Sequence, residues 1–234
     1  MIKTYALTRI FEGGLVKALD GVDFTLGEGE AAAIMGPSGS GKSTLLNIVG
    51  TLDRPTSGEV HYDGKKLGEL GSLSAWRAKN LGFVFQFHHL VPTMTLLENA
   101  EAALRPLRIR APERKRRAGE ELERLGVSHR ADFFPSKVSG GERQRAAIAR
   151  ALAGEARLML ADEPTGQLDH ENGMKAARIL FDRCREKGVA LLVVTHNPEV
   201  AALAPRILKM MDGRLDSWHG GGRISGKDST SCVH

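Results

Sequence analysis

One nine-residue stretch limits what this chain can fold into more than any other part of it. It reads Gly36, Pro37, Ser38, Gly39, Ser40, Gly41, Lys42, Ser43 and Thr44. Apolar runs over 31–35 and 45–49 flank it, which predicts a strand, a glycine loop and a helix in that order. The glycines let backbone N–H groups converge on phosphate oxygens, and the first helical turn adds unpaired N–H groups. Lys42 would reach the β- and γ-phosphates and the Ser43 hydroxyl would hold Mg²⁺. The stretch predicts a nucleoside triphosphate site rather than a plain glycine turn.

Composition sets the limits around this site. With 41% hydrophobic residues among 234, the chain can bury a sizeable core, and its net charge of +5 suits anionic ligands or a negatively charged membrane face. Two cysteines, Cys184 and Cys232, are too few for a disulfide framework and favour a reduced, cytosolic setting. The sequence has no apolar run of about 18 residues and no signal-peptide pattern. We therefore expect any membrane role to need a partner.

Short apolar segments predict a small antiparallel sheet beside the phosphate-binding core. Residues 2–7 and 22–26 read as strands around a polar loop, and 59–62 followed by Asp63 and Gly64 reads as a hairpin. Phe11, in the polar loop, is either a core residue or a ring that stacks on a purine. Taken alone, it favours the core, since buried aromatic residues are usual.

Three buried strands are predicted to end in polar residues. The run 81–85, read as a central strand, precedes Gln86; the run 157–161 precedes Asp162 and Glu163; and the run 189–194 precedes Thr195 and His196. Open α/β sheets place ligands at the carboxyl ends of their strands, so we interpret these residues as a site. Because neighbouring strand residues point to opposite faces, Asp162 would support the Mg²⁺ shell and Glu163 would polarise the attacking water.

The segment between Gln86 and Ser139 predicts helices over 95–105 and 111–125. Its basic cluster comprises Arg105, Arg108, Arg110, Arg114, Lys115, Arg116 and Arg117. We interpret the cluster first as a solvated helix face, with anionic lipid head groups or nucleic acid as the sharper alternatives. The adjacent histidines at 88 and 89 lack a third ligand at a usable spacing, so a metal site is disfavoured there.

A second glycine turn, Ser139, Gly140 and Gly141, opens a strongly helical run to Leu152. It predicts a second anion-binding helix N-terminus, unless Ser139 is an ordinary N-cap. A loop over 166–169, a helix over 170–187 and a hairpin over 207–215 follow. Residues 217–234 are rich in Gly and Ser without periodicity, which predicts a mobile tail.

Over residues 1–216 the chain resembles the nucleotide-binding subunit of ABC transporters, because six motifs occur in order at family-like spacing. They are the Walker A loop (36–43), the Q-loop glutamine (Gln86), the signature (Val138 to Glu142), Walker B (Leu158 to Asp162, then Glu163), the D-loop (Gly166 to Asp169) and the H-loop histidine (His196). The resemblance implies an α/β fold: a P-loop NTPase core with a mostly parallel sheet, an N-terminal antiparallel β-subdomain and an inserted α-helical subdomain over about 87–150. The signature departs from the common Leu-Ser-Gly-Gly-Gln at Val138 and Glu142, and Phe11 replaces the more usual tyrosine.

The resemblance also implies an ATPase that uses ATP and Mg²⁺. Two copies would close head-to-tail with ATP between them, Ser139 and Gly141 of one copy meeting Lys42 of the other across the γ-phosphate. Nucleotide contacts are expected from Phe11, residues 36–44, Gln86, Ser139, Gly140, Gly141 and Asp169. Mg²⁺ contacts are expected from Ser43, Gln86 and Asp162, and catalytic roles from Lys42, Gln86, Glu163 and His196.

Within the family, three segments look like the lipoprotein-releasing type and its macrolide-exporter relatives: Gln86 to Pro92, Ser139 to Arg145, and Ala161 to Gly166. This predicts a peripheral subunit at the cytoplasmic face of the inner membrane, bound to integral membrane subunits and not to nucleic acid. Macrolide or peptide efflux and a division-type signalling role stay open. A nucleic-acid repair ATPase is disfavoured, because the segment from Gln86 to Ser139 is too short for a long coiled coil.

Overall fold

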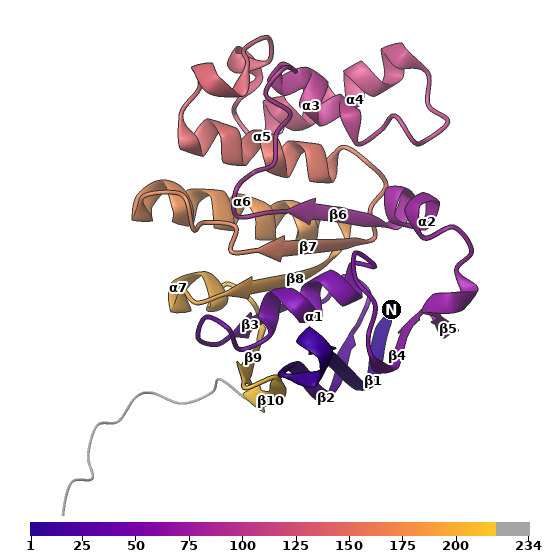
Figure 1. The fold of residues 1–234 in the computed structure, drawn as a ribbon. Coiled ribbons are helices and arrows are strands. Elements are labelled where there is room, and N and C mark those ends of the chain that lie inside the picture. Colours follow the sequence, from indigo (N-terminus) through magenta and orange to yellow (C-terminus); the bar gives the residue numbers. More distant parts are fainter. Residues whose placement is uncertain (219–234) are drawn as a thin grey trace, which may run out of the picture.

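Two sheets organise the computed structural model, which describes residues 1–218 (Figure 1). The larger has the strand order β10-β9-β3-β8-β7-β6, and the smaller has the order β2-β1-β4-β5. The strands of the larger sheet are β3 (Ala31–Met35), β6 (Leu81–Val84), β7 (Leu158–Asp162), β8 (Ala190–Thr195), β9 (Arg206–Met211) and β10 (Arg214–Trp218). Those of the smaller are β1 (Ile2–Phe11), β2 (Val16–Leu26), β4 (Ser57–Tyr62) and β5 (Lys65–Lys66). All pairs in the larger sheet are parallel except β9–β10, and the smaller sheet is antiparallel, which confirms the predicted α/β class.

Helices cover both faces of the parallel sheet, so its central strands are buried throughout. The helices are α1 (Lys42–Val49), α2 (Leu73–Asn80), α3 (Leu96–Ala102), α4 (Ala111–Arg124), α5 (Gly140–Leu152), α6 (His170–Lys187) and α7 (Pro198–Ala201), with 3₁₀ turns at Glu12–Gly14, Leu67–Glu69, Ser128–Arg130 and Pro135–Lys137. In β8, Leu191 and Val193 join the core formed with α5 and α6, whereas Leu192 and Val194 join the core formed with α1 and the antiparallel sheet. This alternation follows from the two-residue repeat of a strand.

Helices α3, α4 and α5 are inserted between β6 and β7 and pack against one another beside the sheet (Figure 1). Thr95 and Glu98 start α3 with a reciprocal capping box, Thr95 Oγ1 accepting from the Glu98 N–H at 3.2 Å. The helices predicted over 95–105 and 111–125 are therefore confirmed, although α3 ends earlier, at Ala102.

Two sequence-based expectations were wrong in detail, and one helix was missed. Strands β1 and β2 extend beyond the predicted 2–7 and 22–26, because register shifts between them interrupt the apolar alternation that marked strand length. The strand before Gln86 lies at the edge of the sheet, not at its centre; α2 and α5 pack against it and bury it as a central strand would be buried. Helix α2 was not predicted, since it is short and has no buried residue.

The predicted tail begins at 217, and residues 219–234 lie outside the described part of the chain. Over residues 1–218, none of the helices combines the length and the apolar character needed to cross a bilayer.

Candidate functional site

Glycines shape the loop between β3 and α1 because neighbouring backbone occupies the space a side chain would need. A Cβ on Gly36 would lie 2.1 Å from the Met210 carbonyl oxygen of β9, and one on Gly41 would lie 2.3 Å from the Ala18 carbonyl oxygen of β2. Gly41 also has a φ of 102°, and Gly39 has a φ of 82° with open space beside it. Pro37 and Ser38 are exposed, and Thr44 is half-buried in the first turn of α1. The loop is thus wedged between β9 and β2 with its tip exposed.

Lys42 lies inside this loop. It is only 7% exposed, and its Nζ donates hydrogen bonds to the carbonyl oxygens of Gly36 and Pro37, each at 2.8 Å. Beside it, the buried Ser40 Oγ has no hydrogen-bond partner among residues 1–218. A buried polar atom without a partner is uncommon and fits a loop that completes its hydrogen bonds with a polar ligand.

The Ser43 hydroxyl and Asp162 meet at the carboxyl ends of the strands. Ser43 Oγ donates to Asp162 Oδ1 at 3.1 Å. Burial raises the pKa of Asp162, the nearby Glu163 charge raises it further, and the Ser43 hydrogen bond and the Lys42 charge act in the opposite direction. A hydroxyl and a carboxylate are oxygen ligands of the kind Mg²⁺ prefers, so this pair fits the ion.

Glu163 turns away from Asp162 toward β8. It has a φ of 44°, so the chain leaves the strand conformation there, and that turn rather than strand alternation separates the two carboxylates. Its Oε2 accepts from Thr195 Oγ1 at 3.1 Å, and its Oε1 accepts from the His196 N–H at 3.0 Å and contacts His196 Nδ1 at 2.8 Å. The structure therefore joins the ends of β7 and β8 through Glu163.

Gln86 and Asp169 make contacts outside the Ser43–Asp162 and Glu163–His196 pairs. The Gln86 amide packs against Gly166, where an added Cβ would lie 2.9 Å from Nε2, and over residues 1–218 Gln86 makes no hydrogen bond to Ser43 or Asp162. Asp169 caps α6: its Oδ1 accepts from the Asn172 N–H at 3.0 Å and its Oδ2 from Asn172 Nδ2 at 2.8 Å. The Asn172 hydrogen bonds lower the Asp169 pKa.

Ser139 begins α5 through a reciprocal capping box with Glu142. Ser139 Oγ accepts from the Glu142 N–H at 3.2 Å, while Glu142 Oε2 accepts from the Ser139 N–H at 2.7 Å. Arg130 Nε donates to Glu142 Oε1 at 3.1 Å, and the Ser139 backbone contact leads the interactions that lower the Glu142 pKa to about 2. Gly140 approaches Leu168, and Gly141 approaches Asn172. In the described chain no hydrogen bond links Ser139 to the 36–44 loop.

Phe11 ends β1, where it pairs with Val16. The Arg9 guanidinium carbon lies 4.4 Å from the centre of the Phe11 ring, and Asp53 holds Arg9 with an ion pair at 3.0 Å. One face of the ring is therefore covered by a cation, and stacking of another ring is confined to the opposite face.

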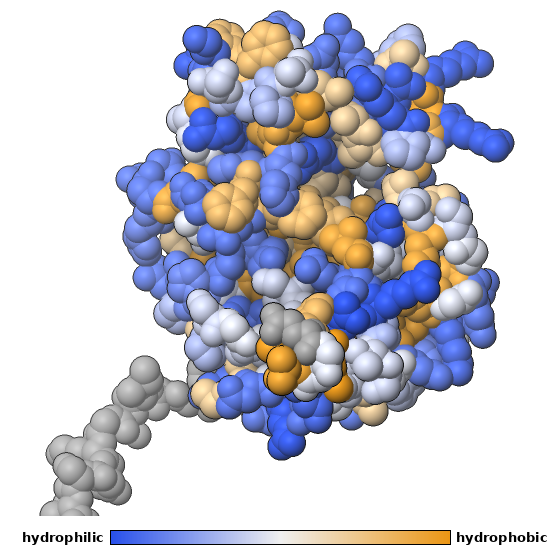
Figure 2. Space-filling model, in the orientation of Figure 1, coloured by the Kyte–Doolittle hydropathy of each residue, from blue (hydrophilic) through white to orange (hydrophobic). Residues whose placement is uncertain are grey.

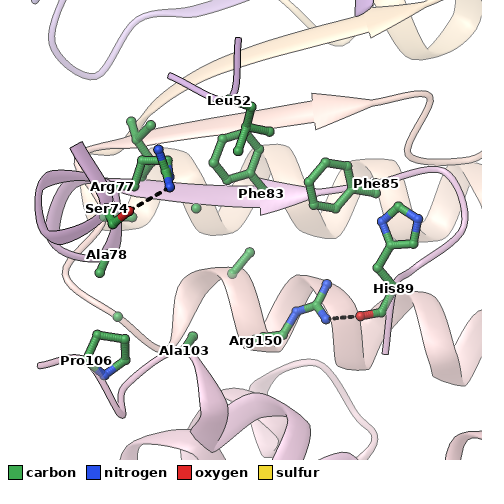
Figure 3. Close-up of a pocket in the computed structure, with 15 residues that line it drawn as sticks. Leu52, Ser74, Arg77, Ala78, Phe83, Phe85, His89, Ala103, Pro106 and Arg150 are labelled. Atoms are coloured by element: carbon green, nitrogen blue, oxygen red, sulfur yellow. Dashed lines mark hydrogen bonds between the residues drawn. The ribbon is translucent and has the colours of Figure 1, made fainter. Parts of the chain in front are cut away.

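A cavity of about 470 Å³, here called the subdomain groove, lies between the inserted helices and the core (Figure 3). Figure 2 shows hydrophobic residues in a hollow between these two parts. The groove is lined by Leu52, Ser74, Arg77, Ala78, Leu81, Gly82, Phe83, Phe85, His89, Ala103, Pro106, Arg150, Ala151, Gly154 and Ala156. The rings of Phe83 and Phe85 stack in it with centres 5.4 Å apart.

Arg150 of α5 contacts the segment that follows Gln86. Its guanidinium donates to the carbonyl oxygens of His88, at 2.7 Å, and of His89 (Figure 3). Both histidines have positive φ, 61° and 47°, which is strained backbone for residues other than glycine. Sequence reasoning did not find Arg150; the signal available was one arginine inside the otherwise apolar helical run 146–152.

With this geometry in place, comparison with known proteins decides the family. The sequence profile of the ABC transporter family matches residues 19–166, more than half of the chain. The chain belongs to the ABC transporter family. As such it is an ATPase that binds ATP with Mg²⁺, in agreement with the motif-based expectation.

Relatives and solved structures agree with this assignment. The ABC chain is 46% identical over 204 residues to the macrolide export ATP-binding/permease protein MacB 1/2 of Paracoccus denitrificans, a match that covers 86% of this chain and 30% of that protein. A dimeric post-hydrolysis structure of the ATP-binding cassette MJ0796 with ADP and Pi has a TM-score of 0.85 and 40% identity, over 94% of this chain and 100% of that one. CbiO1 of Clostridium perfringens, part of the CbiONQ transporter complex, has a TM-score of 0.82 and 26% identity, over 92% and 86%. The expected resemblance to the macrolide-exporter type is confirmed.

Proposed function

We propose that this ABC chain is the motor subunit of a membrane transporter and works as a head-to-tail dimer with ATP at the interface. Residues 1–216 would form the nucleotide-binding domain and 87–150 its helical subdomain. Lys42, Ser43, Asp162, Glu163 and His196 would act from one copy. Ser139, Gly140 and Gly141 would complete the site from the other.

The observation that carries this proposal is the division of the predicted site into two parts. Hydrogen bonds connect Ser43 to Asp162 and Glu163 to His196, whereas Ser139 lies at the start of a separate helix. The N-terminus of α5 offers unpaired N–H groups and a partial positive charge, which suit the γ-phosphate of a nucleotide held by another copy. The dimeric MJ0796 cassette, whose whole chain is covered by a match to 94% of this one, supports this arrangement.

In the proposed cycle, Ser43 and Asp162 would hold Mg²⁺, which would supply positive charge beside the phosphates. Lys42 would leave the Gly36 and Pro37 carbonyl oxygens to reach the γ-phosphate. Glu163, oriented by Thr195 and His196, would polarise the attacking water, and Gln86 would sense the γ-phosphate. Phe11 would stack on adenine by its uncovered face, and Asp169 would contribute from the D-loop.

The subdomain groove is proposed as the docking site of the membrane subunit. Phe83 and Phe85 form its floor, and Arg150 lies on its wall. Because Arg150 also hydrogen-bonds to the segment after Gln86, movement of an occupant would be transmitted toward the γ-phosphate. The chain would then be peripheral, at the cytoplasmic face of the inner membrane. We propose lipoprotein release as the transport activity; kinship with MacB makes macrolide efflux the second candidate.

The dimer is tested with the Glu163→Gln variant, loaded with ATP and Mg²⁺ and sized by light scattering. We expect a dimer, abolished by adding Ser139→Ala but not by the matched change Ser57→Ala on the exposed start of β4. A Glu163→Gln protein that stays monomeric even with its membrane subunits would overturn the proposal.

The cargo is tested on the complex purified from solubilised membranes and reconstituted in vesicles. Stimulation of ATP hydrolysis by a lipid-anchored protein would support lipoprotein release, whereas stimulation by a macrolide alone would replace it with efflux. A response to neither, with intact hydrolysis, would favour a signalling role.

A further inference from the structure

The basic stretch 105–117 contains cations in two different states. Arg114 pairs with Glu101, and Arg116 and Arg117 both pair with Glu113. Four others are exposed and make no ion pair within residues 1–218; they are Arg105, Arg108, Arg110 and Lys115, here called the basic rim. The paired arginines stabilise the helices, whereas the side chains of the basic rim form no ion pair within residues 1–218 that would explain their charge.

An ordered backbone holds the basic rim outward. Leu104 is buried, and Leu107 and Ile109 are half-buried between the exposed arginines. Arg114 Nη1 donates to the Ile109 carbonyl oxygen at 2.8 Å while its Nε donates to Glu101 at 3.0 Å. Because the aliphatic side chains of Leu104, Leu107 and Ile109 pack inward and Arg114 hydrogen-bonds to the loop backbone, the cations project from a fixed surface.

The basic rim borders the subdomain groove. Ala103 and Pro106 of the same loop line the groove on either side of Arg105. Figure 2 shows strongly hydrophilic side chains projecting at the end of the molecule where α4 lies in Figure 1. Here the inference rests on the proposed function: a membrane subunit seated in the groove would contact this loop and would bring it close to the bilayer that holds the subunit.

We propose that the basic rim binds anionic lipid head groups of that membrane. Residues 102–112 contain three arginines and no acidic residue, so their charge is not neutralised locally. Residues 88–132 contain no Phe, Tyr or Trp, so the surface lacks the rings that single-stranded nucleic acid stacks on. Binding to lipid phosphates needs only positive charge near the membrane surface and no aromatic ring.

The test is co-sedimentation of the intact chain with vesicles of phosphatidylglycerol and phosphatidylcholine, compared with phosphatidylcholine alone. We expect binding to the anionic vesicles only, weakened by salt. The double variant Arg105→Gln/Arg108→Gln should bind about 25-fold more weakly, since each cation near an anionic surface contributes about fivefold and the two factors multiply. The matched control Lys3→Gln/Lys65→Gln removes two exposed charges from the antiparallel sheet and should bind like the wild type.

Four results would overturn the proposal. The first two are wild-type affinity of the rim variant for anionic vesicles and an equal loss of affinity in the control variant. The third is tighter binding of the wild type to duplex DNA than to the vesicles. The fourth is a rim variant that binds the vesicles normally but no longer co-purifies with its membrane subunits in detergent. ATP hydrolysis and ATP-dependent dimerisation, measured on the same proteins in solution, keep the two proposals separate. If vesicle binding fails while the dimer forms, only the lipid proposal falls; if the dimer fails, the proposed function falls.

Discussion

Ser43 and Asp162 are 119 positions apart in the chain, yet Ser43 Oγ donates to Asp162 Oδ1 at 3.1 Å. This contact joins the helix after the glycine loop to the end of β7. It also places a carboxylate with a raised pKa beside the ammonium of Lys42. Burial outweighs the Lys42 charge, so negative charge on Asp162 costs stability until a further cation offsets it.

Asp162→Asn should stabilise the nucleotide-free protein at neutral pH. Because the folded-state pKa of Asp162 lies above the ordinary 3.8, its ionised form opposes folding. This loss of folding free energy is absent below pH 3.8 and complete at a pH above the raised pKa. The gain in Tm over wild type should be present at pH 7 and vanish at acidic pH. The same variant should lose more than about a hundredfold in Mg²⁺-dependent hydrolysis. A Tm difference that does not change with pH would contradict this account.

Glu163→Gln should keep ATP binding and reduce ATP turnover by about 10²- to 10⁴-fold, the usual contribution of a general base. The carboxamide oxygen can still accept from the His196 N–H, and the amide NH2 can donate to Thr195 Oγ1 in place of the present bond, so the fold should be unchanged. Equilibrium binding of ATP checks the retained affinity, and a continuous assay of phosphate release checks the reduced turnover. Normal turnover would remove Glu163 from the catalytic role.

Glu142→Ala should destabilise the protein by about 1–2 kcal/mol at pH 7, because it removes half of the α5 capping box. Glu142→Gln should lose less, since its side chain can still accept from the Ser139 N–H. The Glu142 pKa is lowered to about 2, so its contribution should be full above the ordinary value of 4.5 and disappear as pH falls toward 2. Urea unfolding across this range checks it, with Glu123→Ala as an exposed control on α4.

Arg150→Met should cost about 2–3 kcal/mol of stability, because two carbonyl oxygens at strained residues lose a charged donor. It should also raise hydrogen exchange at residues 87–90 while leaving α6 protected. Arg178→Met, on the exposed face of α6, is the matched control. Unchanged exchange at 87–90 would show that Arg150 does not position this segment.

Much of the site could be predicted because its signals are local. The glycine pattern at 36–41 reports backbone that must approach other strands closely, and Ser139 with Glu142 forms a cap between residues three positions apart. Strand ends at Gln86, Asp162 and His196 were visible as apolar runs followed by polar residues. The edge position of β6 was not visible, because burial by α2 and α5 makes an edge strand as apolar as a central one.

The sequence by itself determined the phosphate loop, the glycine turn that opens the helix after Ser139, the order of the strands along the chain and the family, since each depends on residues close together in the chain. Only the tertiary structure decided which side chains meet: Ser43 with Asp162, Glu163 with His196, and Arg150 with the carbonyl oxygens after Gln86. It also decided that the subdomain groove exists and that the basic rim borders it. Contacts across tens of positions depend on how sheets and helices pack, and no local pattern of residue types encodes that packing.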